Sequence, residues 1–485
     1  MIEQDFLNFL TDDNQFLIID GPAGTGKTTL ISSLLLEANK LNLSSDAIAY
    51  TGKAASNLRI KCQGVGRTIH NFIYTFSPKL NDDEDKYVRS WEIDFDGIDI
   101  LFVDECSMIS SGVEGFSVNK EKTFLLPELL NAVKAKKIKK IMLVGDSYQL
   151  PPITKQKKGI EETLFPDSLN EYFLQKNYGL KGSKFSLREN KRYEQDLESY
   201  KLSLEIRDEI ILEQSYKKSP KKWIKSKTSK DKFISSEKEL VKWVIDQGAS
   251  KNFSNIRILT FSNEKADYWN RNIRKALGKI DQGTGEVKNI TLNEPMMNLF
   301  NKDYSKFYNG DSFIISEFIG DSIELDGDID CTRHPSCEKK SNRPSQLKIR
   351  KVKITLFNEN RHEDKIVQLV DRGVIANDDS TKEAYNHRLW CDFASRNDSL
   401  YKRHNKSIED YDEWNDRRNK DENYGSGIAC YAYASTVHKT QGDSFEYVVI
   451  DLEDQDDNLK WLYTALTRCT KDFKLYQKRK LSIFG

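Results

Sequence analysis

Three short apolar runs, each followed by an amphipathic stretch or a polar loop, organise the first 150 residues. The runs cover residues 16–19, 98–105 and 140–146, and they are apolar at most positions before their polar ends, as expected for strands buried on both faces. After the first run, apolar residues recur at helical spacing at Leu30, Ile31, Leu34, Leu35 and Ala38. This alternation predicts an α/β fold built on a parallel sheet.

A different period marks residues 71–95. Apolar and acidic side chains alternate over residues 91–95, the spacing of a half-buried strand. The segment predicts a hairpin of two extended arms with a turn near residues 78–85.

The same alternation returns late in the chain. Strands of a small β-barrel are predicted over residues 307–327, 348–357 and 365–371. The charged and aromatic residues 383–422 that follow predict helices.

The composition is that of a folded chain. Hydrophobic residues make up 38% and aromatic residues 11% of its 485 residues, a length that predicts about three domains. No apolar run reaches membrane-spanning length, and the first residues lack the basic region and cleavage site of a leader. With seven scattered cysteines, we expect a cytoplasmic protein without a membrane partner.

The net charge says little about function, since the chain has 75 basic and 75 acidic residues. A nucleic-acid partner would therefore be held by local patches. Residues 216–232 carry eight lysines, which are either a solvated loop or a direct nucleic-acid contact. Cys331, His334 and Cys337 offer three metal ligands without a clear fourth, so a loop with incidental cysteines is favoured and metal binding is left open.

Residues 18–30, IIDGPAGTGKTTL, form a phosphate-binding loop between a predicted strand and a predicted helix. Its glycines allow backbone N–H groups to surround phosphate oxygens, so we expect ATP as a cofactor. Lys27 should reach the β- and γ-phosphates, and the Thr28 hydroxyl should ligate Mg²⁺. The predicted nucleotide-binding residues of this loop are Gly21, Pro22, Ala23, Gly24, Thr25, Gly26, Lys27, Thr28 and Thr29.

Polar side chains at the ends of the next two strands complete a catalytic set. Asp104 would hold Mg²⁺, and Glu105 would take a proton from the attacking water. Gln149 follows the third strand and is placed to contact the γ-phosphate or its water. Because parallel strands end at one edge of a sheet, we expect these groups to converge.

Seven segments in order resemble the motifs of superfamily 1 helicases. They are AYTGKAASNL (49–58), RTIH (67–70), DECS (104–107), GDSYQLPP (145–152), LRENKRY (187–193), residues 433–451 with HKTQG, and residues 462–473 with TALTR. The sequences of these motifs are similar to those of the RecD-like branch, superfamily 1B, and within it to those of the Dda-like phage helicases. Residues 200–250 and 320–380 carry almost none of this resemblance.

The resemblance implies two RecA-like lobes with ATP between them, a β-hairpin pin, and an SH3-like barrel with a helical tower. The implied domains are a first lobe (1–70 and 96–187), the pin (71–95), a second lobe (188–290 and 426–485), and the barrel with its tower (291–425). It also implies two catalytic arginines, Arg192 and Arg468, a glutamine that reads adenine, Gln4, and a nucleotide contact at Gly442.

The resemblance further implies a groove for single strands. Its residues would be Thr51, Lys53, Thr68, His70, Ser435, Thr436, His438 and Lys439, whose small polar or charged groups suit phosphate contacts. For Thr68 and His70, capping or bracing of local structure is the alternative.

The wedge of the pin would be formed by Pro78, Tyr87 and Trp91, unless the hairpin simply packs on its own lobe. Trp390, Tyr411 and Trp414 in the tower would brace the pin or pack the helices together.

The sequence thus predicts an ATP-dependent DNA helicase that moves 5′ to 3′ along single-stranded DNA and unwinds duplex DNA. An RNA helicase, or an ATP-gated assembly subunit that never unwinds, is the alternative. Single-stranded and forked DNA are the expected partners. A protein partner, such as a nuclease or a single-strand-binding protein, is left open.

Overall fold

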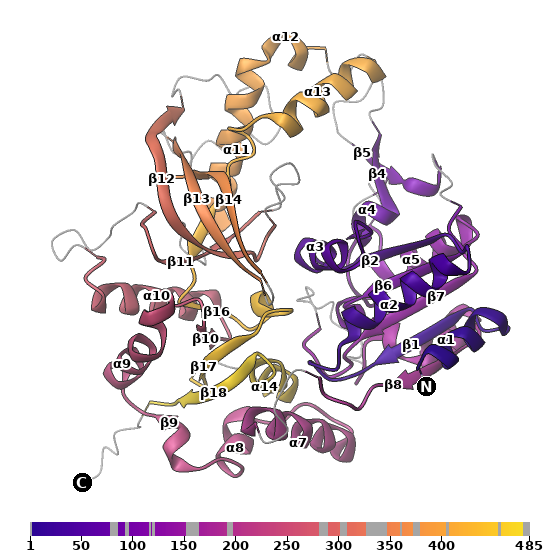
Figure 1. Ribbon diagram of the computed structural model, residues 1–485, viewed down its shortest axis with the longest axis horizontal. Helices are drawn as coiled ribbons and strands as arrows, with labels where there is room; N and C mark the ends of the chain where they lie inside the picture. The colour runs from indigo at the N-terminus through magenta and orange to yellow at the C-terminus, as the bar shows by residue number, and fades with distance from the viewer. Residues whose placement is uncertain are drawn as a thin grey trace. The chain divides into compact units, whose positions relative to one another are not determined.

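The computed structural model forms two compact units (Figure 1). Unit 1 contains residues 1–218 and 459–467, and unit 2 contains residues 219–458 and 468–485. The structure describes residues 2–77, 86–92, 97–115, 118, 122–151, 164–191, 197–280, 290–300, 308–325, 347–358, 361–371, 379–403, 407–453 and 457–478.

Unit 1 is built on a six-stranded sheet in which every paired neighbour is parallel, in the order β3-β2-β6-β7-β1-β8. The three predicted apolar runs form its central strands β1, β6 and β7, which are almost entirely buried. The strands are β1 (Phe16–Asp20), β2 (Ser45–Ala49), β3 (Arg67–Thr68), β6 (Ile100–Asp104), β7 (Lys140–Gly145) and β8 (Gly182–Ser186).

Helices cover both faces of this sheet, because successive side chains of a strand point to opposite faces. Leu17 and Ile19 pack with α1 (Ile2–Thr11), α2 (Lys27–Lys40) and α3 (Gly52–Lys61). Phe16 and Ile18 belong to the core on the other face, with α4 (Ile69–Ile73), α5 (Leu125–Ala135) and α6 (Glu171–Tyr178). The predicted parallel α/β lobe is confirmed.

Unit 1 also holds α7 (Glu198–Glu213) and α14 (Leu459–Leu466), which pack against each other. The predicted lobe boundary at residue 187 therefore differs from the observed division, which lies after Lys218. Contacts between segments far apart in the chain, which no local pattern reveals, assign α7 to this unit.

Unit 2 contains a second all-parallel sheet, in the order β16-β10-β17-β18-β9. Its strands are β9 (Phe233–Ile234), β10 (Ile256–Thr260), β16 (Ala434–Thr436), β17 (Phe445–Asp451) and β18 (Cys469–Tyr476). Its helices are α8 (Pro220–Lys225), α9 (Glu237–Gly248) and α10 (Asn263–Ala276), with Trp269 of α10 fully buried in the core. Two parallel-sheet lobes, as predicted, are present.

An antiparallel sheet in unit 2 closes on itself. Its order is β14-β13-β12-β11-β15, with β11 (Pro295–Asn298), β12 (Ser312–Leu325), β13 (Leu347–Asn358), β14 (Arg361–Val370) and β15 (Ala429–Tyr431). Gly427, just before β15, donates its N–H to Gln368 O (2.8 Å) and accepts from Val370 N (2.9 Å), which joins the two edges. Such closure is that of a small barrel.

Three helices lie in the chain between the barrel strands β14 and β15: α11 (Asp379–Arg396), α12 (Asp398–Tyr401) and α13 (Ile408–Lys420). Trp414 is 3% exposed, and its ring lies 4.7 Å from Phe393 and 5.5 Å from Tyr401. Trp390 contacts Tyr401 edge-on at 5.5 Å. Trp390 and Trp414 therefore pack these helices together, while the side chain of Tyr411 lies outside the described residues.

The predicted hairpin is present, with different bounds. It consists of β4 (Tyr74–Ser77) and β5 (Lys86–Arg89), paired antiparallel, with Tyr87 opposite Phe76. The strand predicted over residues 91–95 is wrong at its start, because Ser90–Glu92 form a 3₁₀ turn. The Ser90 hydroxyl donates to Phe72 O (2.6 Å) and the half-buried Trp91 packs on the core of unit 1. Pro78 and residues 93–96 lie outside the described part.

No helix among the described residues is both long enough and apolar enough to cross a bilayer.

Because Trp91 packs at the base of the hairpin, Trp91→Ala should destabilise unit 1. The loss should be roughly 2 kcal/mol, less than for a fully buried tryptophan, and should appear as a lower urea midpoint. Tyr172→Ala is the matched control, since Tyr172 lies on α6 of the same unit and is 67% exposed. An equal midpoint for the two variants would place Trp91 off the core.

Candidate nucleotide and nucleic-acid sites

The predicted phosphate loop connects the buried strand β1 to the first turn of α2. Gly24 (φ 87°) and Gly26 (φ 81°) both adopt a conformation that favours glycine. A Cβ on Gly21 would lie 2.8 Å from Leu187 Cβ, closer than real Cβ atoms approach. Glycine at these three positions therefore allows the left-handed turns of the loop and its close approach to Leu187.

The Lys27 side chain is hydrogen-bonded to the backbone of this loop. Its Nζ donates to Gly21 O (2.8 Å) and Pro22 O (2.9 Å), and the Thr25 hydroxyl donates to the same Pro22 O (2.9 Å). Both acceptors of Nζ are neutral carbonyl oxygens. A phosphate oxygen would bind the ammonium more strongly, because charge-assisted hydrogen bonds are about twice as strong as neutral ones.

Thr28 and Asp104 meet although they are distant in sequence. The Thr28 hydroxyl donates to Asp104 Oδ2 at 2.9 Å, which joins the start of α2 to the end of β6. Burial raises the pKa of Asp104, and hydrogen bonds from Thr28 and the Glu105 amide offset part of that effect. A hydroxyl and a carboxylate side by side are the ligands that Mg²⁺ takes beside nucleotide phosphates. These residues therefore fit the predicted metal.

Glu105 follows with a strained backbone. Its φ of 55° is left-handed, and its N–H donates to Asp104 Oδ1 at 2.9 Å. Non-glycine residues adopt this region at a cost of about 1–3 kcal/mol, and such strain is often found at functional sites as well as in turns. The strand ends at this turn, and the half-buried Glu105 directly follows Asp104 at the carboxyl edge of the sheet, which is compatible with the predicted role of a general base.

The loop after β7 lies at the same edge. Ser147 donates its N–H (2.9 Å) and its hydroxyl (2.8 Å) to Asp20, which also pairs with Lys184 at 2.8 Å. Burial raises the pKa of Asp20, but the Lys184 charge and these hydrogen bonds outweigh it and hold the pKa below its ordinary value. Gln149 is 4% exposed, and its Oε1 has no hydrogen-bond partner within the described residues.

An orphaned buried acceptor is costly, so the Gln149 side chain is suited to a ligand or an ordered water. The contacts of Asp20, Ser147 and Lys184 were missed by the sequence reasoning. A signal for Asp20 existed, since it directly precedes the phosphate loop at the end of a buried strand.

The strand register orders the predicted groups along one edge of the sheet. Asp104 is paired with Ala49, which in turn is paired with Thr68. The phosphate loop, Asp104 and Glu105 therefore follow β1 and β6 at the centre, whereas Thr51 and Thr68 lie at β2 and β3 toward the rim. The carboxyl edge of the sheet therefore holds the residues predicted to bind the nucleotide at its centre and residues predicted to bind nucleic acid toward one side.

Thr51 and Thr68 are N-caps. Their hydroxyls accept hydrogen bonds from Ala54 N (3.1 Å) and Asn71 N (3.2 Å), at the starts of α3 and α4. The capping alternative for Thr68 is thus observed. It is compatible with phosphate binding, because a hydroxyl that accepts still carries its own donor.

The side chains of His70 and Lys53 are largely shielded from solvent. Burial lowers the pKa of His70, whose ring stacks on Tyr74 with centroids 6.3 Å apart. Tyr74, the first residue of the hairpin, shares a 2.6 Å hydrogen bond with Thr123. Lys53 is 6% exposed. The imidazole therefore braces the base of the hairpin as a largely neutral ring, the bracing role left open by the sequence.

Unit 2 carries the other predicted groove residues on its edge strand. Ser435 and Thr436 are on β16, and His438 and Lys439 are on the 3₁₀ turn that follows (His438–Thr440). Ser435 Oγ is buried without a partner among the residues described. Both sheets thus present small hydroxyl residues at a rim strand.

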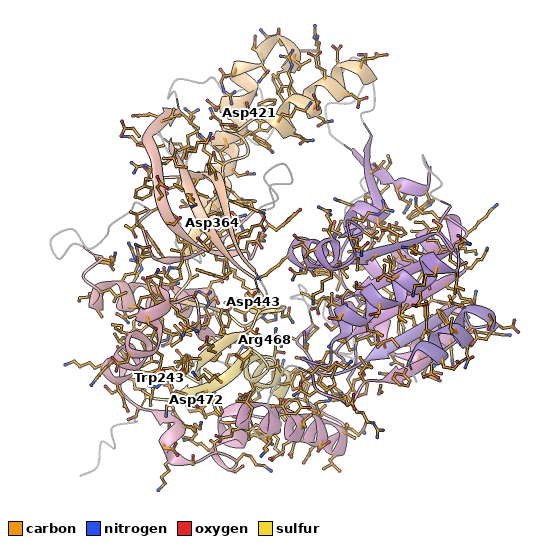
Figure 2. The ribbon with its side chains drawn as sticks, in the orientation of Figure 1. Trp243, Asp364, Asp421, Asp443, Arg468 and Asp472 are labelled. Carbon is orange, nitrogen blue, oxygen red and sulfur yellow. The ribbon has the colours of Figure 1, made fainter. Side chains whose placement is uncertain are left out.

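Arg468 lies beneath the loop that contains Gly442. Its Nη1 donates to Asp443 O (3.0 Å) and Thr440 O (3.3 Å), and its side chain is buried; Figure 2 labels Arg468 and Asp443. Gly442 has a φ of 84°, which favours glycine. The guanidinium thus shapes the loop of its own unit, a contact not foreseen from the sequence.

Other predicted residues are not placed in a site. Arg192, Cys331, His334 and Cys337 lie outside the described residues. Gln4 is exposed and donates to Asn8 Oδ1 (3.2 Å) within α1.

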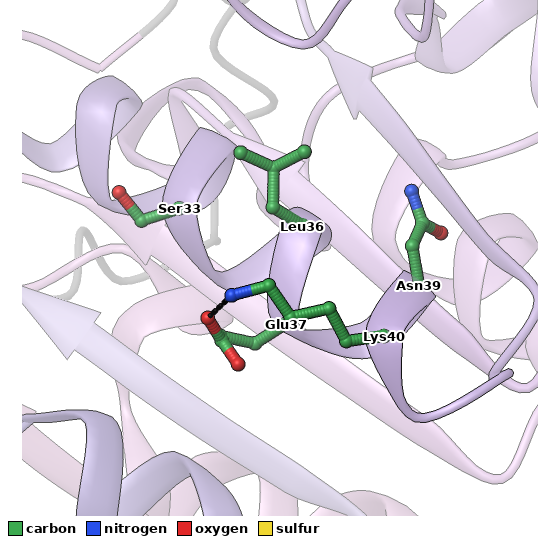
Figure 3. Close-up of a pocket in the computed structure, with 5 residues that line it drawn as sticks. All are labelled: Ser33, Leu36, Glu37, Asn39 and Lys40. Carbon is green, nitrogen blue, oxygen red and sulfur yellow. Dashed lines mark hydrogen bonds and ion pairs between the residues drawn. The ribbon is translucent and has the colours of Figure 1, made fainter.

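Two surface features of the chain lie apart from these sites. In the lysine-rich segment, Lys221 pairs with Glu453 (3.0 Å) and Lys232 with Asp472 (2.7 Å), as in a solvated surface. Figure 3 shows a hollow along the exposed side of α2, where Glu37 pairs with Lys40 (2.6 Å). No predicted site residue lines this hollow.

Two family models match the chain. Residues 9–155 match the AAA domain, and residues 431–475 match the UvrD-like helicase C-terminal domain. The first match contains the phosphate loop, Asp104, Glu105 and Gln149, and the second contains Arg468.

Curated relatives match over only part of their length. An uncharacterized protein of Methanocaldococcus jannaschii is 24% identical over 97% of this chain and 37% of its own. The ATP-dependent DNA helicase Pif1 of Campylobacter jejuni is 28% identical over 33% of each chain. The chain thus spans about a third of the length of these relatives.

Solved Pif1 helicase structures are also similar. One from Bacteroides, in complex with ADP-AlF3 and ssDNA, has a TM-score of 0.46 and 17% identity, covering 97% of this chain and 91% of that one. One from Candida albicans has a TM-score of 0.49 and 14% identity, covering 98% and 94%. The narrower likeness to the Dda-like helicases stays a prediction.

The lowered pKa of His70 predicts a pH effect on stability. The stability that His70 contributes should be complete above the unfolded pKa of about 6.5 and should be lost as pH falls through the folded value. His70→Gln should remove this loss, so the variant should lose less free energy of unfolding than wild type between pH 7.5 and 5.5. The difference should be at most about 1.4 kcal/mol, because pH 5.5 lies only about one unit below the unfolded pKa, and it is measured by urea unfolding at both pH values. Identical pH dependence in both proteins would contradict it.

Proposed function

We propose that the chain belongs to the Pif1/RecD-like helicases of superfamily 1B and that it is an ATP-driven DNA motor. The matches to the AAA domain, to the UvrD-like helicase C-terminal domain and to the Pif1 helicase support this proposal. In this proposal it moves 5′ to 3′ along single-stranded DNA and separates duplex DNA ahead of it. The polarity rests on the resemblance of its motifs to that branch.

The observation that carries the proposal is the Thr28–Asp104 hydrogen bond with Lys27 and Glu105 around it. Lys27 would bind the β- and γ-phosphates, while Thr28 and Asp104 would hold Mg²⁺. When bound, Mg²⁺ neutralises phosphate charge. Glu105 would accept the proton of the attacking water at its carboxylate.

Gln149, Arg192 and Arg468 have supporting roles in this proposal. The orphaned amide oxygen of Gln149 would accept a hydrogen bond from the water or contact a phosphate through its amide N–H. The two arginines would stabilise charge on the transferred phosphoryl group, as arginine fingers do.

The hairpin β4–β5 is proposed as the pin that parts the duplex. Its base is held by Arg89, which donates to Glu128 Oε2 (2.8 Å) and Oε1 (3.0 Å), a bidentate pair. Such anchoring supports a rigid wedge. Tyr87 and Pro78 remain the proposed wedge residues, whereas the packing of Trp91 on the core supports an anchoring role.

Lys27→Ala and Glu105→Gln should each abolish strand-stimulated ATPase, and with it unwinding of a forked duplex. Loss of the Glu105 base should cost roughly 10² to 10⁴ in rate while ATP still binds. Lys40→Ala, at the exposed end of the same helix α2, is the matched control and should retain full activity.

The assay should run on forked DNA and on forked RNA in parallel. Preference for RNA would assign the chain to the RNA helicases. Strand-stimulated ATPase without any unwinding would favour an assembly subunit. Near wild-type turnover in Glu105→Gln would overturn the catalytic assignment.

Salt should reveal which groove residues neutralise phosphates. Log affinity for single-stranded DNA should fall linearly with log salt, and Lys439→Ala should make the slope shallower by about 0.7. His70→Gln should leave the slope unchanged, because a neutral imidazole releases no counterion. Lys251→Ala, an exposed lysine of unit 2, is the control. A slope that Lys439→Ala does not alter would remove Lys439 from the groove.

A further inference from the structure

Helix α14 holds the loop that carries Gln149. The Tyr463 hydroxyl donates to Asp146 Oδ2 at 2.6 Å, and Lys460 Nζ donates to Ser147 O at 3.1 Å. The N–H of Leu150 donates to Thr464 Oγ1 at 3.0 Å. Three contacts from a single helix therefore fix the loop on both sides of Gln149.

Arg207 of α7 completes this cluster. Its guanidinium carbon lies 4.1 Å from the ring centre of Tyr148, and its Nη1 lies 3.4 Å from both Asp146 Oδ1 and the Tyr463 hydroxyl. Asp146 and Tyr463 are fully buried. Burial and the Asp146 carboxylate raise the pKa of Tyr463 well above its ordinary value, so the phenol stays a donor.

We call these contacts of Tyr463, Lys460, Thr464 and Arg207 with residues 146–150 the clamp. Gln149 lies within this clamp, and its amide oxygen is buried without a partner in the described part of the chain. A displacement of the Gln149 backbone must therefore strain the bonds to Tyr463 and Thr464 or move α14 with it. Helix α14 ends at Leu466, and Arg468 follows two residues later, in unit 2. One helix is thus bonded to the Gln149 loop and continuous with Arg468.

We propose that Tyr463 and Arg207 are positioning residues that couple the nucleotide state sensed at Gln149 to Arg468, and thereby to the affinity for single-stranded DNA. This inference rests on the proposed function, in which Gln149 meets the γ-phosphate. Neither residue touches the nucleotide. Their role is to make the loop and α14 move as one body.

The test is a linkage measurement on the full chain. The dissociation constant of a fluorescent oligothymidylate is measured with ADP and with a non-hydrolysable ATP analogue. The coupling factor is the larger of these two dissociation constants divided by the smaller, and it is typically about 5 to 150. Tyr463→Phe removes one hydroxyl and should bring the ratio to within about twofold of one. The affinity for the analogue without DNA and the melting temperature should stay near wild type.

Tyr268→Phe is the matched control. Its hydroxyl also donates to a carboxylate at 2.6 Å, that of Glu237, far along the chain from the clamp. It should leave the ratio unchanged. Thr464→Val, which removes the acceptor of the Leu150 N–H, is a second variant of the clamp and should lower the ratio in the same direction.

Three outcomes distinguish the possibilities. A reduced ratio in both clamp variants with an unchanged control supports the inference. Full coupling in stably folded Tyr463→Phe and Thr464→Val, or an equal loss in Tyr268→Phe, overturns it while leaving the motor intact. A wild-type chain without strand-stimulated ATPase overturns the proposed function itself, and the inference with it.

Discussion

The hydrogen bond between Thr28 and Asp104 is the contact on which the nucleotide site depends, since it joins groups 76 residues apart in the chain. It forms because β6, β7 and β1 are parallel neighbours whose carboxyl ends meet at one edge. Burying the Asp104 carboxylate opposes its charged form, and the Thr28 hydroxyl and Glu105 amide compensate in part. A cation placed there would satisfy the same carboxylate more fully.

The same geometry distributes the remaining chemistry. Strands at the centre of the sheet in unit 1 end in the phosphate loop and the acidic pair, whereas β2 and the edge strand β3 lead into the caps Thr51 and Thr68. The parallel sheet of unit 2 is arranged similarly, with the hydroxyl residues Ser435 and Thr436 on its edge strand β16. Short hydroxyl side chains suit both tasks, because one oxygen can cap a helix and still donate a hydrogen bond.

Several parts of the molecule depend on buried polar groups rather than on apolar packing alone. Asp20 with Lys184, Asp146 with Tyr463 and Arg207, and Glu128 with Arg89 each join segments that are distant in sequence. A buried polar group must be paired, so each cluster permits few arrangements of its segments. Such restriction suits a motor whose loops must respond to a phosphate.

Much of this was readable from local patterns. The apolar runs at β1, β6 and β7, the helical period of α2 and the glycines of the phosphate loop act over a few residues, and the structure agrees with each. Of the residues that would bind Mg²⁺, Asp104 follows from its place at a strand end and Thr28 from the phosphate-loop motif. Trp91 shows the limit, since its alternation predicted a strand but packing on the core placed it in a 3₁₀ turn. The Tyr463–Asp146 clamp, the burial of Arg468 against Thr440 and Asp443, and the division of the chain after Lys218 had no sequence signal. They arise from contacts between segments about 25 to more than 300 residues apart, which depend on how the sheets and helices fold together and not on any local periodicity.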